Sequence, residues 1–147
     1  MSAPGQPARA AAAALVAGVL HDGRRLSELD ATLAALSGPE RARAQRLAAG
    51  VLRHLGRIDA VIDPHLRKRP PPAARDALRL AAAEMFLDGV PPHAAVDGAV
   101  RLARAHPKAR HLSGLVNAVA RRVAEAPEAW DAAADGGLAA WLDAPVR

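Results

Sequence analysis

The sequence predicts an all-α protein, a bundle of six to seven helices divided into two sub-bundles. Apolar residues recur at spacings of three and four along most of the chain, whereas alternating β-branched runs and Asn-Gly turns are missing. Three consecutive prolines at positions 70–72 form a rigid break between two halves. The 147 residues suffice for one domain with a substantial core. We therefore expect three or four helices before the prolines and three after them.

The first helix is expected to follow a short arm. Residues 1–7 hold two prolines, a glycine and small residues, so we predict a flexible N-terminal arm there. A helix then runs from about Pro7 to Asp22, because its apolar residues share one face and Gly23 lies near its end. Ser27 is predicted to cap a second helix that ends around Leu36.

A capping box, Ser37-Gly38-Pro39-Glu40, starts the third helix. Its apolar stripe continues to Ile62, although Gly56 is a place where the helix could kink or divide. On a second face, four arginines lie within about 80° of one another with Gly50 among them. Such a row fits a phosphate backbone, and an ordinary solvated face is the alternative. The arginines are Arg43, Arg46, Arg53 and Arg57.

Helices near residues 73–88, 92–106 and 111–125 are predicted beyond the prolines. Pro91 and Pro92 fix the start of the second of these, because proline presets φ and needs no donor in the first turn. We expect His93 to cap or pack in that turn. Asn117 interrupts an apolar stretch of the third helix, so we expect it to be buried and hydrogen-bonded to a neighbouring backbone.

Charge is distributed unevenly along the chain. The formal net charge is +5, but residues 1–125 hold 19 basic and 11 acidic groups. No acidic residue occurs between Gly98 and Ala124, a stretch that ends with Arg121 and Arg122. A basic surface of this kind suits a polyanion such as nucleic acid, although a GC-rich genome also favours arginine and alanine. The near absence of aromatic residues excludes base stacking on sheet-borne rings.

Some of these arginines have a plainer interpretation. Asp97 lies four residues before Arg101 and seven before Arg104. Glu125 lies four residues after Arg121. Helical ion pairs are therefore the alternative to RNA contact for these arginines. Arg9 is predicted to lie on the mobile arm, from which a cation can reach a ligand.

Motifs for catalysis, metal binding and membrane insertion are missing from the sequence. The chain has no cysteine, which excludes a disulfide scaffold, a thiolate zinc site and a cysteine nucleophile. Its histidines show no i,i+4 pairing, and it has neither a phosphate-cradling glycine loop nor a nucleophile elbow. No apolar run reaches the length of a transmembrane helix. We expect a cytoplasmic chain with no metal, no membrane partner and no enzymatic activity of its own.

Three stretches carry a family resemblance through their order and separation. They read AGVLRHLGRID at 49–59, VPPHAAV at 90–96 and LVNAVARR at 115–122. Together they resemble the NusB-like family, most closely the N-terminal domain of Sun/Fmu-type 16S ribosomal RNA cytosine-5 methyltransferases. The likeness covers about residues 8–125. It departs from the family at AAAEMF, residues 81–86, where Gly, Tyr and Gln are usual.

The resemblance implies a NusB-like domain at residues 8–126 that binds RNA, ribosomal RNA in the first place, through its basic surface. Pro91, Pro92, His93 and Asn117 are then structural motif residues. The predicted RNA contacts are Arg9, Arg43, Arg46, Arg53, Arg57, Arg121 and Arg122.

The resemblance also implies a partner domain that this sequence does not contain. In the full methyltransferases a Rossmann-like domain follows, binds S-adenosylmethionine and carries the cysteine nucleophile. Residues 127–147 are predicted to form an acidic tail or linker with a short helix around 138–142, and the stretch WLDAP at 141–145 resembles the start of the family's interdomain linker. We expect no cofactor in the chain itself. Two alternatives stay open: a free-standing NusB-type antitermination factor that binds RNA with a ribosomal protein, and a protein-interaction domain without RNA contact.

Overall fold

Helices make up most of the chain in a computed structural model that describes residues 5–25 and 30–133, and these ranges contain no strand. The predicted all-α fold is therefore confirmed. The helices are α1 (Gln6–Leu20), α2 (Asp30–Leu33), α3 (Gly38–Arg53), α4 (Leu55–Ile62), α5 (Pro72–Phe86), α6 (Pro92–Ala105), α7 (Ser113–Ala124) and α8 (Pro127–Ala132), with short 3-10 turns η2 (Asp63–His65) and η3 (Arg110–Leu112).

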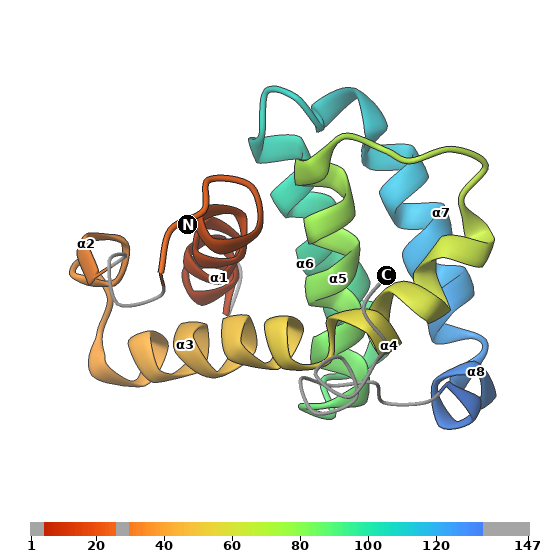
Figure 1. Cartoon of the computed structure of the whole chain (residues 1–147), viewed down its shortest axis with the longest axis horizontal. Helices are drawn as coiled ribbons and strands as arrows, with labels where there is room; N and C mark the ends of the chain where they lie inside the picture. The colour runs from red at the N-terminus through yellow and green to blue at the C-terminus, as the bar shows by residue number, and fades with distance from the viewer. Residues whose placement is uncertain (1–4, 26–29, 134–147) are drawn as a thin grey trace, which may run out of the picture.

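The helices form two sub-bundles that share one core (Figure 1). In the first, α1 packs along α3, with α2 beside α1. In the second, α5, α6 and α7 pack against one another, and α4 and α8 close the lower side. Helices α1 and α3 both contact α5, so the buried side chains of Leu15, Leu47 and Leu78 belong to the same apolar cluster. The core thus sits around α5, the helix of the second sub-bundle that both α1 and α3 contact.

The helix starts follow the local sequence signals. The Ser37 hydroxyl accepts a hydrogen bond from the Glu40 backbone N–H at 3.3 Å, as the capping box predicts. The Pro91 carbonyl accepts from the backbone N–H groups of Ala94 and Ala95, so the double proline does start α6. Helix α1 begins at Gln6, inside the segment predicted as an arm. The predicted cap at Ser27 lies outside the described residues.

The long third helix predicted from the apolar stripe is two helices. The break falls at His54, whose φ of −110° and ψ of 24° leave the helical region, two residues before the predicted division at Gly56. Helix α4 then turns toward α5, α7 and α8. This turn buries Ile58 and Ile62 against the second sub-bundle. It also removes Arg57 from the face that carries the α3 arginines.

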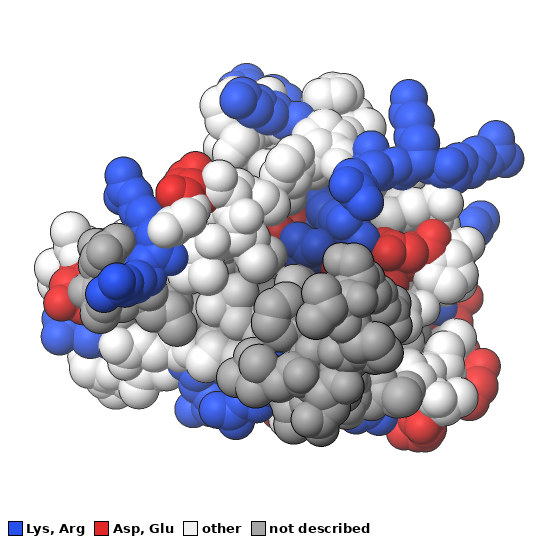
Figure 2. All heavy atoms as spheres, in the orientation of Figure 1, with Lys and Arg blue, Asp and Glu red and all other residues white. Residues whose placement is uncertain are grey.

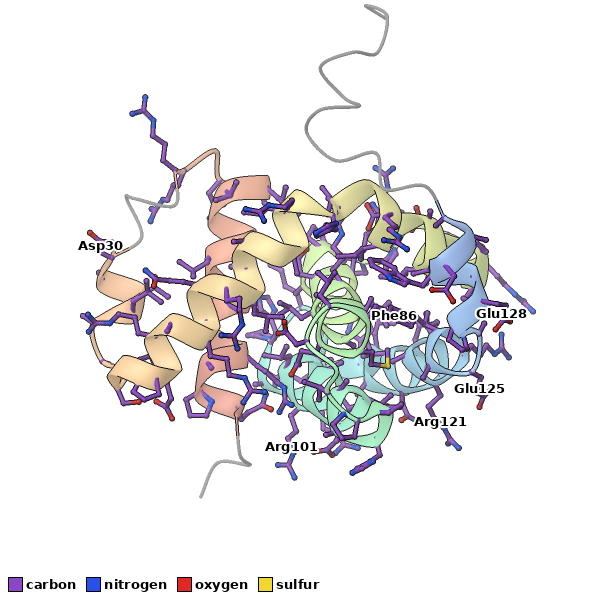
Figure 3. The ribbon with its side chains drawn as sticks, turned by 90° about the horizontal axis from the view of Figure 1, so that it is seen from below. Asp30, Phe86, Arg101, Arg121, Glu125 and Glu128 are labelled. Atoms are coloured by element: carbon purple, nitrogen blue, oxygen red, sulfur yellow. The ribbon has the colours of Figure 1, made fainter. Side chains whose placement is uncertain are left out.

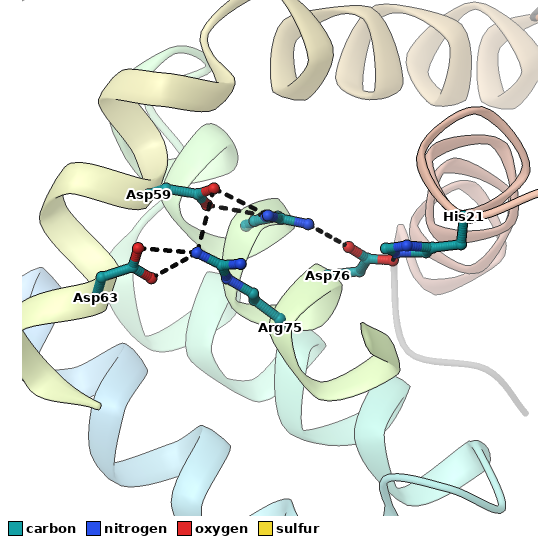
Figure 4. A network of polar contacts seen from close by, with 6 residues as sticks. His21, Asp59, Asp63, Arg75 and Asp76 are labelled. Carbon is teal, nitrogen blue, oxygen red and sulfur yellow. Dashed lines mark hydrogen bonds and ion pairs between the residues drawn. The ribbon is translucent and has the colours of Figure 1, made fainter. Parts of the chain in front are cut away.

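A polar network joins α4, α5 and the end of α1 (Figure 4). The Arg79 guanidinium donates to both carboxylate oxygens of Asp59 at 2.9 Å and to Asp76 at 3.0 Å. His21 contacts the other Asp76 oxygen at 2.9 Å, and Arg75 pairs with Asp63 at 2.8 Å. Burial alone lowers the pKa of Arg79, but its bonds and attraction to Asp59 and Asp76 outweigh that effect and raise the pKa. Arg79 is therefore a permanent cation that holds α4 on α5.

Residues 127–132 form helix α8, where the sequence predicts the start of a tail. Its Trp130 is only 7% exposed and stacks on Phe86 of α5, with ring centroids 5.0 Å apart. A stacked aromatic pair of this size holds a segment firmly to the core. The segment from Pro127 to Ala132 is thus part of the bundle. The short helix predicted around residues 138–142 lies outside the described residues.

Candidate nucleic-acid interface

A groove of about 720 Å³ runs between α6 and α7. The two helices are consecutive and run in opposite directions, joined by residues 106–112 (Figure 1). Each contributes a stripe of residues four apart, the spacing that places side chains on one helix face. The α6 stripe is Pro92, Val96, Val100 and Arg104, and the α7 stripe is Ser113, Asn117, Arg121 and Glu125.

The antiparallel arrangement places a guanidinium at each end of the groove. Arg104 in the last turn of α6 lies at the end that holds Ser113, the first residue of α7. Arg121 in the last turn of α7 lies at the opposite end, with Pro92 and His93 at the start of α6. Between these ends, the half-buried Asn117 lies opposite an apolar wall of valines. The groove therefore combines an apolar wall, one amide, two cations and two carboxylates, Asp97 and Glu125.

The two groove arginines are not neutralised by the ion pairs expected along their helices. Asp97 forms an ion pair with Arg101 at 2.8 Å, one of the helical pairs considered from the sequence, and no ion pair with Arg104. No ion pair joins Arg121 to Glu125, and both side chains are exposed. Figure 3 shows Arg101 and Arg121 projecting outward at the edge where α6 and α7 lie. Within the described residues, Arg104 and Arg121 thus keep their charge available to solvent.

Asn117 does not play the predicted role. We expected a buried amide tied to a backbone, but the side chain is only half-buried and has no hydrogen bond within the described part of the chain. The reason is its place on the α7 face that turns to the groove, while Val116 and Val119 point into the core. His93 likewise lies exposed at the groove, and its side chain makes no capping hydrogen bond.

Two predicted contact arginines are bound to partners within the protein, Arg9 buried and Arg57 partly buried. Arg9 lies in the first turns of α1, not on a mobile arm: it is 4% exposed, and its Nε donates to Glu84 Oε1 at 2.7 Å. The Arg57 guanidinium donates to the Trp130 carbonyl at 2.8 and 3.1 Å and lies 3.9 Å above the Trp130 ring centroid. Glu84 and Trp130 come from distant elements, so a local reading of the sequence missed both partners. These corrections remove Arg9 and Arg57 from the exposed basic surface.

The remaining arginines of α3 form a second, smaller cleft. Arg46 and Arg53 line a space of about 270 Å³ together with Leu87. Both are exposed, and Arg46 makes only a long ion pair of 3.9 Å with Asp88. Arg43 is more enclosed and reaches Glu84 at 3.5 Å. Gly50 lies in this cleft, where a Cβ would be 3.2 Å from the Leu87 side chain, so the glycine accommodates Leu87.

Other basic groups surround these clefts. Arg122, beside Arg121, is exposed and has no ion pair among the described residues. Figure 2 shows Lys and Arg side chains projecting from the face that carries the segment between η2 and α5, which contains the exposed Arg67, Lys68 and Arg69. The positive surface is therefore broader than the set predicted from the sequence. Arg104 in particular is not among the RNA contacts predicted from the sequence.

A signal for Arg104 was present in the sequence. The four-residue spacing from Pro92 to Arg104 and the same spacing from Ser113 to Glu125 predict two facing stripes, once the helices are known to be antiparallel neighbours.

No helix within residues 5–25 and 30–133 is long and apolar enough to cross a membrane. Over the same ranges, no cluster of three or more potential ligand side chains could hold a metal ion.

The fold and the groove define a class, an all-helical domain with a solvent-open cleft whose two arginines form no ion pair within the described residues. The chain belongs to the NusB family, whose sequence profile matches residues 6–125. T. maritima NusB has a similar structure, with a TM-score of 0.73 and 24% identity over 89% of this chain and 99% of that chain. A chain in a structure described as "Crystal Structure of a Plectonemic RNA Supercoil" matches with a TM-score of 0.76, 24% identity, and coverage of 84% of this chain and 95% of that one. No curated protein sequence matches significantly.

Proposed function

We propose that this chain is the RNA-binding, substrate-recognition domain of a cytoplasmic ribosomal RNA cytosine-5 methyltransferase. Membership of the NusB family and the two segments VPPHAAV and LVNAVARR support the proposal. The methyl donor, S-adenosylmethionine, would be bound by a separate catalytic domain. The part played by this chain is to hold the RNA.

One observation carries the RNA-binding step: several exposed arginines lack an internal counter-ion. Arg53, Arg104, Arg121 and Arg122 form no ion pair within the described residues and belong to α3, α6 and α7. The segment from Gly98 to Ala124 adds no acidic residue that could neutralise them. Guanidinium groups that are free of carboxylates bind phosphates in a bidentate manner. RNA is a polyanion that presents such phosphates in a row.

A free-standing antitermination factor is a second candidate, and one observation favours it. The structural match covers 99% of the T. maritima NusB chain, so the similarity extends over that whole protein. In that case the RNA would be bound together with a ribosomal protein. The open reading frame of the gene distinguishes the two candidates: a cysteine-bearing methyltransferase domain encoded in frame after codon 147 supports the first and contradicts the second.

Salt dependence tests the RNA binding itself. Four phosphate contacts predict a slope of about −3 for the logarithm of the binding constant against the logarithm of the salt concentration with single-stranded RNA. The measurement is fluorescence anisotropy of a labelled ribosomal RNA fragment titrated with the purified chain. Arg53→Ala should lower the affinity and reduce the slope by about 0.7. A slope near zero, or no binding of any RNA, contradicts the proposal and favours a protein-interaction domain.

A further inference from the structure

We propose that the α6–α7 groove binds an unpaired nucleobase of the RNA, with the Asn117 amide on the base edge and Arg104 and Arg121 on the flanking phosphates. This inference rests on the RNA binding proposed above and assigns it a place and a kind of ligand. Such a site would make binding selective for bases and for single strands. Phosphate contacts alone would not do so.

Asn117 supplies the group that can read a base. Its amide has two N–H donors and one acceptor oxygen, and none of them has a partner within the described residues. The side chain is half-buried and lines a groove that is open to solvent, so the amide is available to a ligand. An adjacent donor and acceptor match the edges of nucleobases, where Asn and Gln form bidentate pairs.

The opposite wall suits the flat face of a base. Val96 and Val100 are each 8% exposed and lie one turn apart on α6, and Pro92 extends this wall toward Arg121. No residue that lines the groove is aromatic, so a base there would pack against this apolar wall and not against a ring. A volume of about 720 Å³ accommodates a nucleotide.

The two arginines are spaced for the backbone on either side of that nucleotide. From Ser113, which lies at the Arg104 end, to Arg121 the rise along α7 is about 12 Å at 1.5 Å per residue. A base centred on Asn117 therefore has one guanidinium before it and one after it along the groove. His93 and Ser113 add a polar group at each end. Glu125 is the one acidic lining residue that no ion pair within the described chain neutralises, and it lies beside Arg121.

The same geometry disfavours a duplex. In A-form RNA the Watson–Crick edges are already paired, and side chains cannot read the deep, narrow major groove. An amide recessed between two helices reaches a base edge only when the base is splayed out of a stack. We therefore expect single-stranded RNA to bind more tightly than a duplex of the same length and composition.

The test compares the four RNA homopolymers, of one short length, with a mixed-sequence duplex by fluorescence anisotropy at fixed salt. The wild-type chain should prefer one base over the others. Asn117→Leu, which keeps the side-chain size and removes the amide, should reduce that preference by roughly tenfold, the discrimination typical of one bidentate amide–base pair. Arg121→Ala should instead weaken binding to all four homopolymers alike. Ala118→Leu, at an exposed position of α7 outside the groove, is the matched control.

The outcomes separate this inference from the proposed function. RNA binding with equal affinities for the four homopolymers, or a preference that survives in Asn117→Leu, overturns the inference and leaves RNA binding intact. The groove would then be open to another partner, such as a protein segment. Failure of the wild-type chain to bind any RNA overturns both. Thermal unfolding followed by circular dichroism checks that each variant is folded.

Discussion

Arginine side chains have opposite roles in two regions of the molecule, the junction of α1, α3 and α5 and the groove between α6 and α7. At the junction, Arg9 and Arg43 converge on a single buried carboxylate, Glu84, which is 1% exposed. In the groove, Arg104 and Arg121 face solvent without a counter-ion among the described residues. The helices that carry them are similar. The difference is that α5 supplies a carboxylate to the junction arginines, whereas no described element forms an ion pair with the groove arginines.

This difference separates the basic residues that stabilise the fold from those that can bind RNA. A buried cation costs a large desolvation free energy unless a carboxylate compensates it, so Arg9 is committed to Glu84. The partly buried Arg57 is held by two hydrogen bonds to the Trp130 carbonyl and by the contact of its guanidinium with the Trp130 ring. An exposed cation keeps its hydration and exchanges it for phosphate at little cost. Mutations at the junction should therefore change stability, and mutations in the groove should change binding.

Removal of the buried carboxylate should have the largest effect. Glu84→Ala removes the buried carboxylate that pairs with Arg9 between α1 and α5, so we expect the free energy of unfolding to fall by about 3–5 kcal/mol. Urea unfolding followed by circular dichroism measures the change. Glu128→Ala removes an exposed acid from α8 and should change stability by less than about 0.5 kcal/mol. Equal effects of the two variants would contradict the structural role of Glu84.

A methyl group at Gly98 should disturb the same junction from the α6 side. An ideal Cβ there would lie 2.5 Å from Arg9 Nε, and the ion pair with Glu84 prevents that guanidinium from moving away. We expect Gly98→Ala to lower stability by about 1–3 kcal/mol, although alanine has the higher helix propensity. Gly114→Ala is the control, because nothing lies within 4 Å of a Cβ at that helical position. A Gly98→Ala protein as stable as the wild type would show that Arg9 is not fixed.

The loss of Arg57 should lower stability and leave RNA binding unchanged. Arg57→Ala removes two hydrogen bonds to the Trp130 carbonyl and the stack on its ring, so α8 should detach more easily at a cost of about 1–2 kcal/mol. The salt slope of RNA binding should stay the same as in the wild type. A slope reduced as far as in Arg53→Ala would return Arg57 to the phosphate-binding set predicted from the sequence.

Local signals in the sequence predict the helices well, and they predict the partners of single side chains poorly. The capping box at Ser37 and the double proline before His93 act within one turn, so the residues themselves specify the helix starts. The side chain of Arg9 is bound by Glu84, 75 residues away, and that of Arg57 by the Trp130 carbonyl, 73 residues away. Neither partner is specified by neighbouring residues in the sequence. The predicted burial of Asn117 is wrong for a different reason, because one residue along α7 decides whether a side chain faces the core, as Val116 does, or the groove.

Neutralisation of Glu125 should give the smallest effect, and it tests the groove without removing a cation. Glu125 lies one turn from Arg121 but forms no ion pair with it, so its carboxylate mainly lowers the positive potential at that end of the groove. Glu125→Gln should raise RNA affinity about two- to threefold at about 50 mM salt and less at about 200 mM, because salt screens exposed charges. Glu128→Gln removes the same charge three residues on, outside the groove, and is the matched control. An equal gain from both variants would mean that only net charge matters, whereas a gain confined to Glu125→Gln places the phosphate beside Arg121.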